Sequence, residues 1–164
     1  MKVEKAVVNA SPLIILFKSG LADLLPKLFA EVVVPEAVWR EVMAGGESDE
    51  ATSQLPSVSW LRREATQTIA PGVLIWNLGD GESEVLSFAL ARPEHRALVD
   101  DHAARSCART LGIRPLGTGG ALVLAKKRGL IKSVSAELEK LRDAGLWLSN
   151  EMITLLKEQA GELD

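Results

Sequence analysis

Residues 2–17 read KVEKAVVNASPLIILF, and this stretch decides the fold. Its first seven residues are rich in valine, which predicts a short buried strand with Asn9 at its end. Ser11-Pro12 then predicts the start of a helix, with Ser11 as the N-cap and Pro12 in the first helical position, where its missing N–H costs nothing. The stretch therefore predicts one strand followed at once by one helix, the first unit of a parallel sheet.

The remainder of the chain repeats this alternation. Residues 47–72 are the least regular part, and we expect one helix and one or two strands there around Trp60. Strands separated by helices imply right-handed crossovers and a mostly parallel sheet covered on both faces. We therefore predict one domain, residues 1–164, folded as a three-layer α/β/α sandwich. The expected strands are 31–34, 97–99 and 114–116, and the expected helices are 13–18, 21–29, 35–43, 80–91, 101–111, 119–128, 136–144 and 150–160.

Composition places the chain among globular proteins. It has 164 residues, of which 47% are hydrophobic and 25% charged, and that length suffices for one buried core. No apolar run approaches the roughly 20 residues needed to cross a bilayer, and the N-terminus does not resemble a signal peptide. The single cysteine, Cys107, cannot form an internal disulfide or a zinc cluster, so we expect a reducing, cytoplasmic location.

The charge distribution favours a phosphodiester substrate. The net charge is −3, yet residues 92–132 hold nine basic side chains against three acidic ones. An acidic centre beside a basic margin suits a substrate with a phosphate backbone held at a metal site.

Helical spacing separates inward acids from outward ones. Glu82 precedes apolar residues of its helix by three, four and seven positions, so it is predicted to share their buried face. Glu84 lies about 200° away around the same helix and is predicted to face water. Glu41 follows Ala37 by four positions and Val38 by three, which again predicts an inward side chain.

Further polar residues follow the expected strands. Ligand sites of parallel sheets lie at the carboxyl ends of the strands, and Asn9 and Asp100-Asp101 follow two of them. Together with Glu41 and Glu82 these residues can converge at one edge. Clustered carboxylates raise one another's pKa unless a divalent cation neutralises them, and Mg²⁺ prefers such oxygen ligands.

Structural alternatives exist for several of these residues. Glu41 can instead be a helix-terminal acid that reaches solvent. Asp80 is better explained as a helix N-cap than as a metal ligand, and Asp101 fits either role. Thr118 in the sequence Gly117-Thr118-Gly119-Gly120 is expected to cap a helix whose N-terminus can accept a phosphate.

The helix over residues 101–111 presents two contrasting faces. Cys107 lies on its apolar stripe and is expected in the core. Arg105 and Arg109 share the opposite face, where they can bind phosphate or simply be solvated. His95 and His102 are expected at the surface. The four tryptophans are expected to be packing residues: Trp39, Trp60, Trp76 and Trp147.

Several segments resemble PIN-domain proteins when taken in order. They are VVNASPLI (7–14), VPEAVWREV (34–42), GDGESE (79–84), LVDD (98–101) followed by Arg105, and LGT (116–118). The resemblance runs from about residue 3 to residue 160 and is closest to a prokaryotic PIN-like subfamily related to VapC-type toxins.

The resemblance implies a metal-dependent endoribonuclease. It places the catalytic carboxylates on Glu41, Glu82 and Asp100, which with Asn9 and Asp101 would bind Mg²⁺ or Mn²⁺. Arg105, Arg109 and Thr118 are the expected RNA-binding residues. Such proteins are often toxins restrained by an antitoxin protein, and homodimers are common.

One position departs from the family pattern. Asn9 stands where typical members have an aspartate, and an amide oxygen can bind a hard cation but brings no charge. The alternative to a ribonuclease is therefore a catalytically silent PIN-like module that binds RNA or a protein.

Overall fold

The computed structural model describes residues 4–45, 50–65 and 68–163. Within these residues the chain forms a parallel five-stranded sheet with strand order β3-β2-β1-β4-β5. The predicted parallel sheet is thus confirmed. The strands are β1 (Lys5–Val8), β2 (Val32–Pro35), β3 (Leu61–Glu64), β4 (His95–Leu98) and β5 (Pro115–Leu116).

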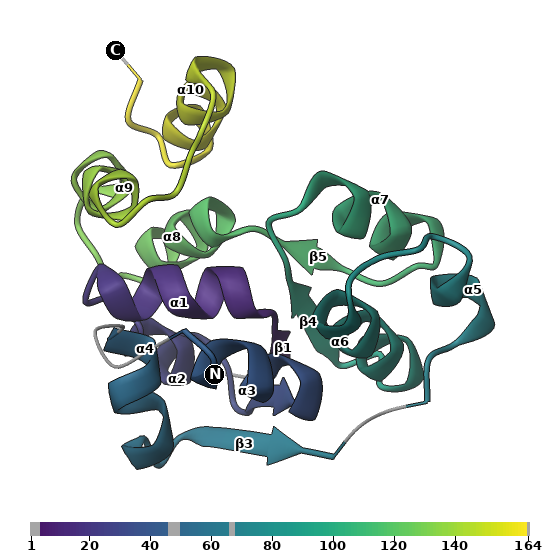
Figure 1. Cartoon of the computed structure of the whole chain (residues 1–164). Helices are drawn as coiled ribbons and strands as arrows, with labels where there is room; N and C mark the ends of the chain where they lie inside the picture. Colours follow the sequence, from purple (N-terminus) through teal and green to yellow (C-terminus); the bar gives the residue numbers. More distant parts are fainter. Residues whose placement is uncertain (1–3, 46–49, 66–67, 164) are drawn as a thin grey trace.

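Helices cover both faces of the sheet, as Figure 1 shows for α1, α2 and α8 on one side and α6 and α7 on the other. This is the predicted three-layer α/β/α arrangement. The helices are α1 (Ala10–Lys18), α2 (Leu24–Leu28), α3 (Glu36–Met43), α4 (Glu50–Gln54), α5 (Pro71–Leu74), α6 (Asp80–Ala91), α7 (His102–Thr110), α8 (Thr118–Lys127), α9 (Val134–Asp143) and α10 (Asn150–Gln159), with a 3-10 turn at Leu55–Ser57.

The strand order contains a reversal between β1 and β4. The chain first steps from β1 outward to β2 and β3, then returns to β4 on the other side of β1 and steps outward to β5. Val8 of β1 pairs with Leu98 of β4. In open parallel sheets the crevice beyond such a reversal, at the carboxyl ends of the strands, is where ligands bind. Asn9 follows β1 at this point, and Asp100 lies two residues beyond β4.

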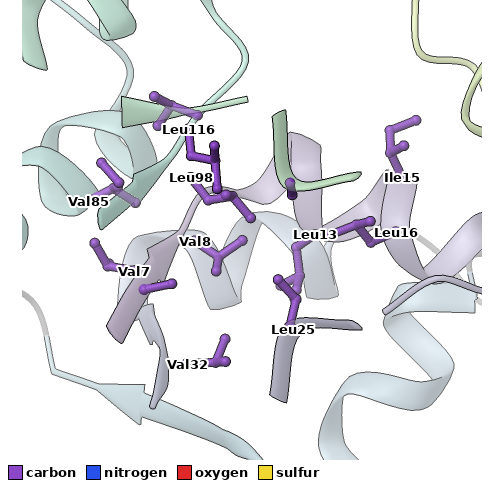
Figure 2. Packing of buried hydrophobic residues seen from close by; sticks show 14 of the residues in the cluster. Val7, Val8, Leu13, Ile15, Leu16, Leu25, Val32, Val85, Leu98 and Leu116 are labelled. Carbon is purple, nitrogen blue, oxygen red and sulfur yellow. The ribbon is translucent and has the colours of Figure 1, made fainter. Parts of the chain in front are cut away.

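The core forms where the apolar faces of the sheet and helices meet, and Figure 2 shows part of it. Val7, Val8 and Leu98 from the central strands are fully buried, as are Leu13 of α1 and Val85 of α6. Burying a side chain of this size stabilises the fold by about 1.5–3 kcal/mol. The rigidity of this core fixes the strand ends from which the polar residues project.

Several helix starts differ from those predicted. α1 begins at Ala10 with Asn9 as its N-cap, so Ser11 does not cap it and Pro12 is its third residue. α8 begins at Thr118 with Gly117 as its N-cap, which corrects the predicted capping role of Thr118. α6 has Gly79 as its N-cap, so Asp80 is a helical residue and not a cap.

Other expectations are decided by burial. Cys107 is in the core as predicted, and burial raises the pKa of its thiol. His95, expected at the surface, is buried in β4 with its ring edge-on to Phe88. His102 is exposed as predicted. Around Trp60 the structure places α4, the 3-10 turn and β3, while residues 46–49 and 66–67 lie outside the described residues.

No helix among the described residues is long and apolar enough to span a bilayer.

Candidate functional site

Asn9 is a buried polar residue at the reversal between β1 and β4. Its backbone N–H donates to the carbonyl of Leu98 at 3.0 Å, which ties the end of β1 to β4. The side chain is 7% exposed, and its Oδ1 has no hydrogen-bond partner among the described residues. An acceptor left unsatisfied in the folded protein costs about 1–3 kcal/mol, so a donor or a cation at this atom would be stabilising.

Glu41 of α3 approaches the same point as the Asn9 amide. A Cβ atom placed on Gly81, in the first turn of α6, would lie 3.1 Å from Asn9 Oδ1 and 3.5 Å from Glu41 Oε1. The missing side chain of Gly81 therefore lets α6 come close to both oxygens. A cavity of about 330 Å³ opens here, and Glu41 and Gly81 are among its lining residues.

Glu82, also in the first turn of α6, lies near two further acids. Partial burial raises the pKa of Glu82, and the negative charges of Asp101 and Glu41 raise it further. A divalent cation among these carboxylates would oppose all three effects. Asp101 also N-caps α7, because its Oδ2 accepts the N–H of Ala104 at 3.0 Å, so the capping alternative is confirmed and leaves its other oxygen for this cluster.

Asp100 is held by the start of α8. Its Oδ1 accepts the backbone N–H of Thr118 at 2.7 Å, and its Oδ2 accepts the Thr118 hydroxyl at 2.6 Å. Asp100 thus occupies the helix N-terminus that was expected to be free for a phosphate. Arg105 Nη1 and Asp100 Oδ1 both lie within 3.4 Å of the point where a Cβ atom on Gly117 would stand.

A comparison with models of protein families assigns the chain to a family. A model described as a PIN domain matches residues 5–162. The chain belongs to the PIN-domain family. Neither the curated proteins nor the solved structures gave a significant match.

PIN domains are nuclease-type modules that generally use divalent metals and bind nucleic acid. In this PIN domain, Asn9 and the Asp100-Asp101 pair follow adjacent parallel strands, while Glu41 and Glu82 come from α3 and α6 beside them. Oxygen donors of this kind suit Mg²⁺ or Mn²⁺.

The acidic side chains of the described residues do not form a preformed metal site. Among residues 4–45, 50–65 and 68–163, no three His, Cys, Asp or Glu side chains are grouped closely enough to hold a metal ion. Asn9 and Glu41 lie beside Gly81, and the charges of both Asp101 and Glu41 act on Glu82. Asp100 is held separately by Thr118.

Helical spacing gave the wrong exposure for two acids. Glu41 is exposed, although its spacing from Val38 predicted an inward side chain. Glu84 is only 5% exposed, although it was predicted to face water. Glu41 instead fits the alternative of a helix-terminal acid that reaches solvent. Glu84 is buried because α6 is covered nearly all round, since α3, α5, α7 and three strands all pack on it. Glu84 thus meets α3, and its Oε1 accepts the N–H of Ala37 at 3.4 Å, where the helix dipole favours a negative charge.

Some basic residues of the segment 92–132 form ion pairs within the protein. Arg114 and Arg128 pair with Glu4, and Lys126 pairs with Glu162, so part of the basic segment serves the fold. Arg109 is exposed and Arg105 is partly buried. Thr118, expected to contact nucleic acid, is 0% exposed and acts only through Asp100.

Sequence reasoning missed two residues. Glu84 lines the same cavity as Glu41, but its burial depends on α3, which spacing within α6 does not reveal. Trp147, expected to be a packing residue, is 81% exposed. Its position between two helices and after Gly145 was the available signal, because loop residues are usually at the surface.

Proposed function

We propose that this PIN domain is an endoribonuclease that depends on Mg²⁺ or Mn²⁺. The observation that carries the proposal is the buried Asn9 Oδ1, which lacks a partner among the described residues and approaches the carboxylate of Glu41. A hard cation is the partner that suits an amide oxygen beside a carboxylate. Glu41, Glu82 and Asp100 are the proposed catalytic carboxylates, with Asn9 and Asp101 as further ligands.

The electrostatics support the same assignment. The charges of Asp101 and Glu41 raise the pKa of Glu82, so the apo site carries repulsion that a cation relieves. When bound, such a cation activates water and stabilises the charge that develops on a phosphate. The Asn9 amide adds no charge, so we expect affinity to be weaker than in the same site with a carboxylate in place of Asn9.

Other residues of the chain hold the substrate and orient the site. Asp100 is fixed by two hydrogen bonds from Thr118, which keeps its carboxylate at the edge of the sheet. Arg109 is exposed on α7, and the Nε of Arg105 has no acceptor among the described residues. Both guanidinium groups are proposed to bind RNA phosphates, for which Arg is well suited.

A cleavage assay tests the proposal. We expect slow cleavage of single-stranded RNA with Mn²⁺, and its loss with EDTA or with Asp100→Asn. Asp143→Asn is the matched control, because Asp143 is exposed at the end of α9 and its substitution removes the same charge. Cleavage that persists in EDTA contradicts the metal mechanism.

A second function is favoured by the neutral side chain of Asn9. Without the charge of an aspartate, the domain can be a silent module that binds RNA or a protein. RNA binding without cleavage by the purified protein, with Mn²⁺ or Mg²⁺ present, would support this alternative.

The family resemblance extends the proposal to partners and location. We propose that residues 1–164 act as one unit, as a cytoplasmic homodimer and as the toxin of a toxin–antitoxin pair. The buried thiol of Cys107 fits a reducing compartment. Sedimentation of the purified chain tests the dimer. Growth arrest on expression, relieved by a protein encoded beside this one and not seen with Asp100→Asn, tests the toxin role.

A further inference from the structure

A second hollow adjoins the candidate site on the side of α10. This groove has a volume of about 440 Å³. Its lining includes Asp100 and Arg105 as well as Trp147, Met152 and Leu155. Asp100 and Arg105 belong both to the groove and to the edge of the sheet. A chain-like ligand bound at the candidate site can therefore continue into the groove.

Trp147 has a place in the groove that packing does not explain. It is 81% exposed, although leaving so large an apolar ring in water is unfavourable. The loop that carries it is fixed at both ends. The N–H of Leu146 donates to the Leu141 carbonyl at 3.0 Å, and Ser149 Oγ accepts the N–H of Met152 at 3.1 Å. The indole is therefore presented by an ordered loop.

Glycines form part of the groove wall on α8. Gly119 and Gly120 line it, and a Cβ atom on Gly119 would lie 2.5 Å from Leu156 Cδ1. The glycines let α10 approach α8 and leave few side chains on that wall. A groove lined by both an exposed aromatic ring and a guanidinium group suits a planar group attached to a phosphate.

We infer that this groove binds an unpaired nucleobase of single-stranded RNA, stacked on Trp147, with the adjoining phosphate at Arg105. This inference rests on the ribonuclease proposal, since it names the form of RNA that reaches Asp100. Arg105 supplies the groove with a guanidinium group whose buried Nε lacks a partner among the described residues. This donor favours a phosphate-bearing ligand over an apolar peptide, even though the Asp100 carboxylate lines the same groove. Aromatic stacking accepts any base, so the groove selects single strands more than sequence.

Fluorescence anisotropy of a labelled eight-nucleotide RNA tests the inference. The RNA is compared with a series in which each position in turn is abasic, and electrophoresis checks that it stays intact. Trp147→Ala should raise Kd by about 5- to 100-fold, the range that corresponds to loss of one stacked base. Trp147→Phe should keep most of the affinity. Ile75→Ala is the matched control, because Ile75 is also 81% exposed but does not line the groove.

The abasic series tests whether one RNA base stacks on Trp147. One abasic position should weaken binding to the wild type and leave binding to Trp147→Ala unchanged. Equal loss in both proteins, or wild-type affinity of Trp147→Ala, overturns the inference. It is also overturned if Trp147→Ala leaves RNA affinity intact but dissociates an oligomer of the chain. RNA bound through Trp147 but never cut would keep the inference and remove the ribonuclease proposal.

Discussion

Asp100 accepts both hydrogen bonds that Thr118 can donate, one from the backbone N–H at 2.7 Å and one from the hydroxyl at 2.6 Å. The pair joins the segment after β4 to the first residue of α8. Thr118 therefore positions an acid of the candidate site, and Thr118 itself is fully buried.

Thr118→Val removes the hydroxyl and keeps the shape of the side chain. Because a hydrogen bond to a charged group contributes about 1.5–3 kcal/mol, we expect a loss of that size in the free energy of unfolding, measured in urea. Thr110→Val is the control, since the Thr110 hydroxyl donates to a carbonyl of its own helix at the surface. It should change stability by no more than about 0.5 kcal/mol. Equal effects of the two variants would contradict the assigned role of Thr118.

Asn9→Asp should strengthen metal binding and weaken the apo protein. The added charge attracts the cation but repels Glu41 when no metal is present. We expect a loss of about 0.5–3 kcal/mol in apo stability. Tenfold tighter binding would add about 1.4 kcal/mol of stabilisation at saturating Mn²⁺. Thermal unfolding with and without Mn²⁺ measures both effects.

Asn150→Asp is the matched control for this substitution. Asn150 is exposed at the start of α10, so the same added charge lies away from Glu41. Its metal-dependent rise in melting temperature should equal that of the wild type. If Asn9→Asp also leaves this rise unchanged, Asn9 does not face the cation.

The order of the elements could be predicted from the sequence, because parallel strands alternate with helices along the chain. The expected ends of the strands placed Asn9 and Asp100 correctly at one edge of the sheet. The spacing of apolar residues was less informative for α6, since a helix covered on most sides has no single buried face. The exposure of Glu84 in α6 was therefore mispredicted. Glu41, near the end of α3, is exposed, as the alternative of a helix-terminal acid that reaches solvent predicts.

Residues whose roles depend on distant neighbours could not be assigned from the sequence. Thr118 was expected to cap α8 with its own hydroxyl. The sequence does not show that the Asp100 carboxylate lies beside Thr118 and accepts that hydroxyl. Trp147 was expected in the core, because aromatic residues usually bury their rings. For Thr118 the deciding partner, Asp100, is 18 positions away along the chain.

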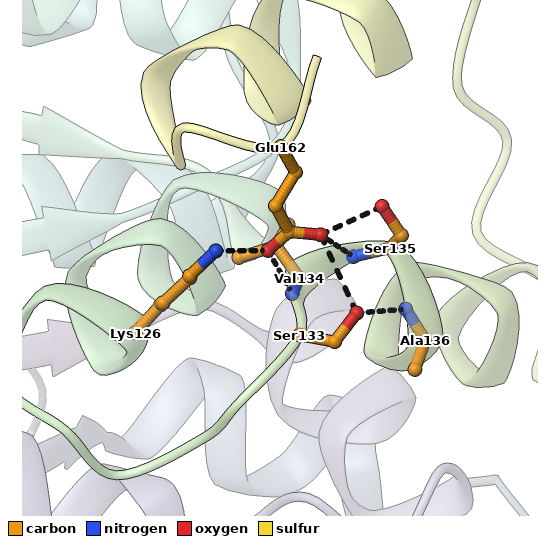
Figure 3. Close-up of polar contacts among 6 residues, drawn as sticks. All are labelled: Lys126, Ser133, Val134, Ser135, Ala136 and Glu162. Atoms are coloured by element: carbon orange, nitrogen blue, oxygen red, sulfur yellow. Dashed lines mark hydrogen bonds and ion pairs between the residues drawn. The ribbon is translucent and has the colours of Figure 1, made fainter. Parts of the chain in front are cut away.

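Glu162 ties the end of the chain to two helices, as Figure 3 shows. Its carboxylate accepts hydrogen bonds from Lys126 at 2.8 Å and from the N–H groups of Val134 at 2.6 Å and Ser135 at 2.9 Å. Lys126 and these N–H groups hold the pKa of Glu162 far below its ordinary value of 4.5. The stabilisation is therefore complete at neutral pH and is lost as the pH falls below about 4.5.

Glu162→Gln should lower the free energy of unfolding at pH 7 by about 1–2 kcal/mol, since it weakens a partly sheltered set of charged hydrogen bonds. The difference from the wild type should shrink as urea unfolding is repeated at successively lower pH. Glu139→Gln is the control, because Glu139 is exposed and pairs only within α9. A difference that does not vary with pH would show that the charge of Glu162 is unimportant.

Gly119→Ala should loosen the contact between α8 and α10. The new Cβ atom would lie 2.5 Å from Leu156 Cδ1, and overpacking of this kind typically costs about 1–3 kcal/mol. Combining it with Leu156→Ala removes the clash. The double variant should therefore lose less stability than the sum of the two single losses, by at least about 0.5 kcal/mol. Leu155→Ala, at a more exposed position of α10, should combine additively. Additivity with Leu156→Ala would contradict the contact.

Anomalous diffraction from crystals soaked in Mn²⁺ tests the metal site most directly, because it locates the ion without requiring a substrate. The account predicts one peak at the reversal between β1 and β4, coordinated by Asn9 Oδ1 together with carboxylate oxygens of Glu41 and Glu82. It predicts that the same peak strengthens in Asn9→Asp at equal Mn²⁺ concentration. A peak that lies elsewhere, or no peak at saturating Mn²⁺, would contradict the proposed metal centre.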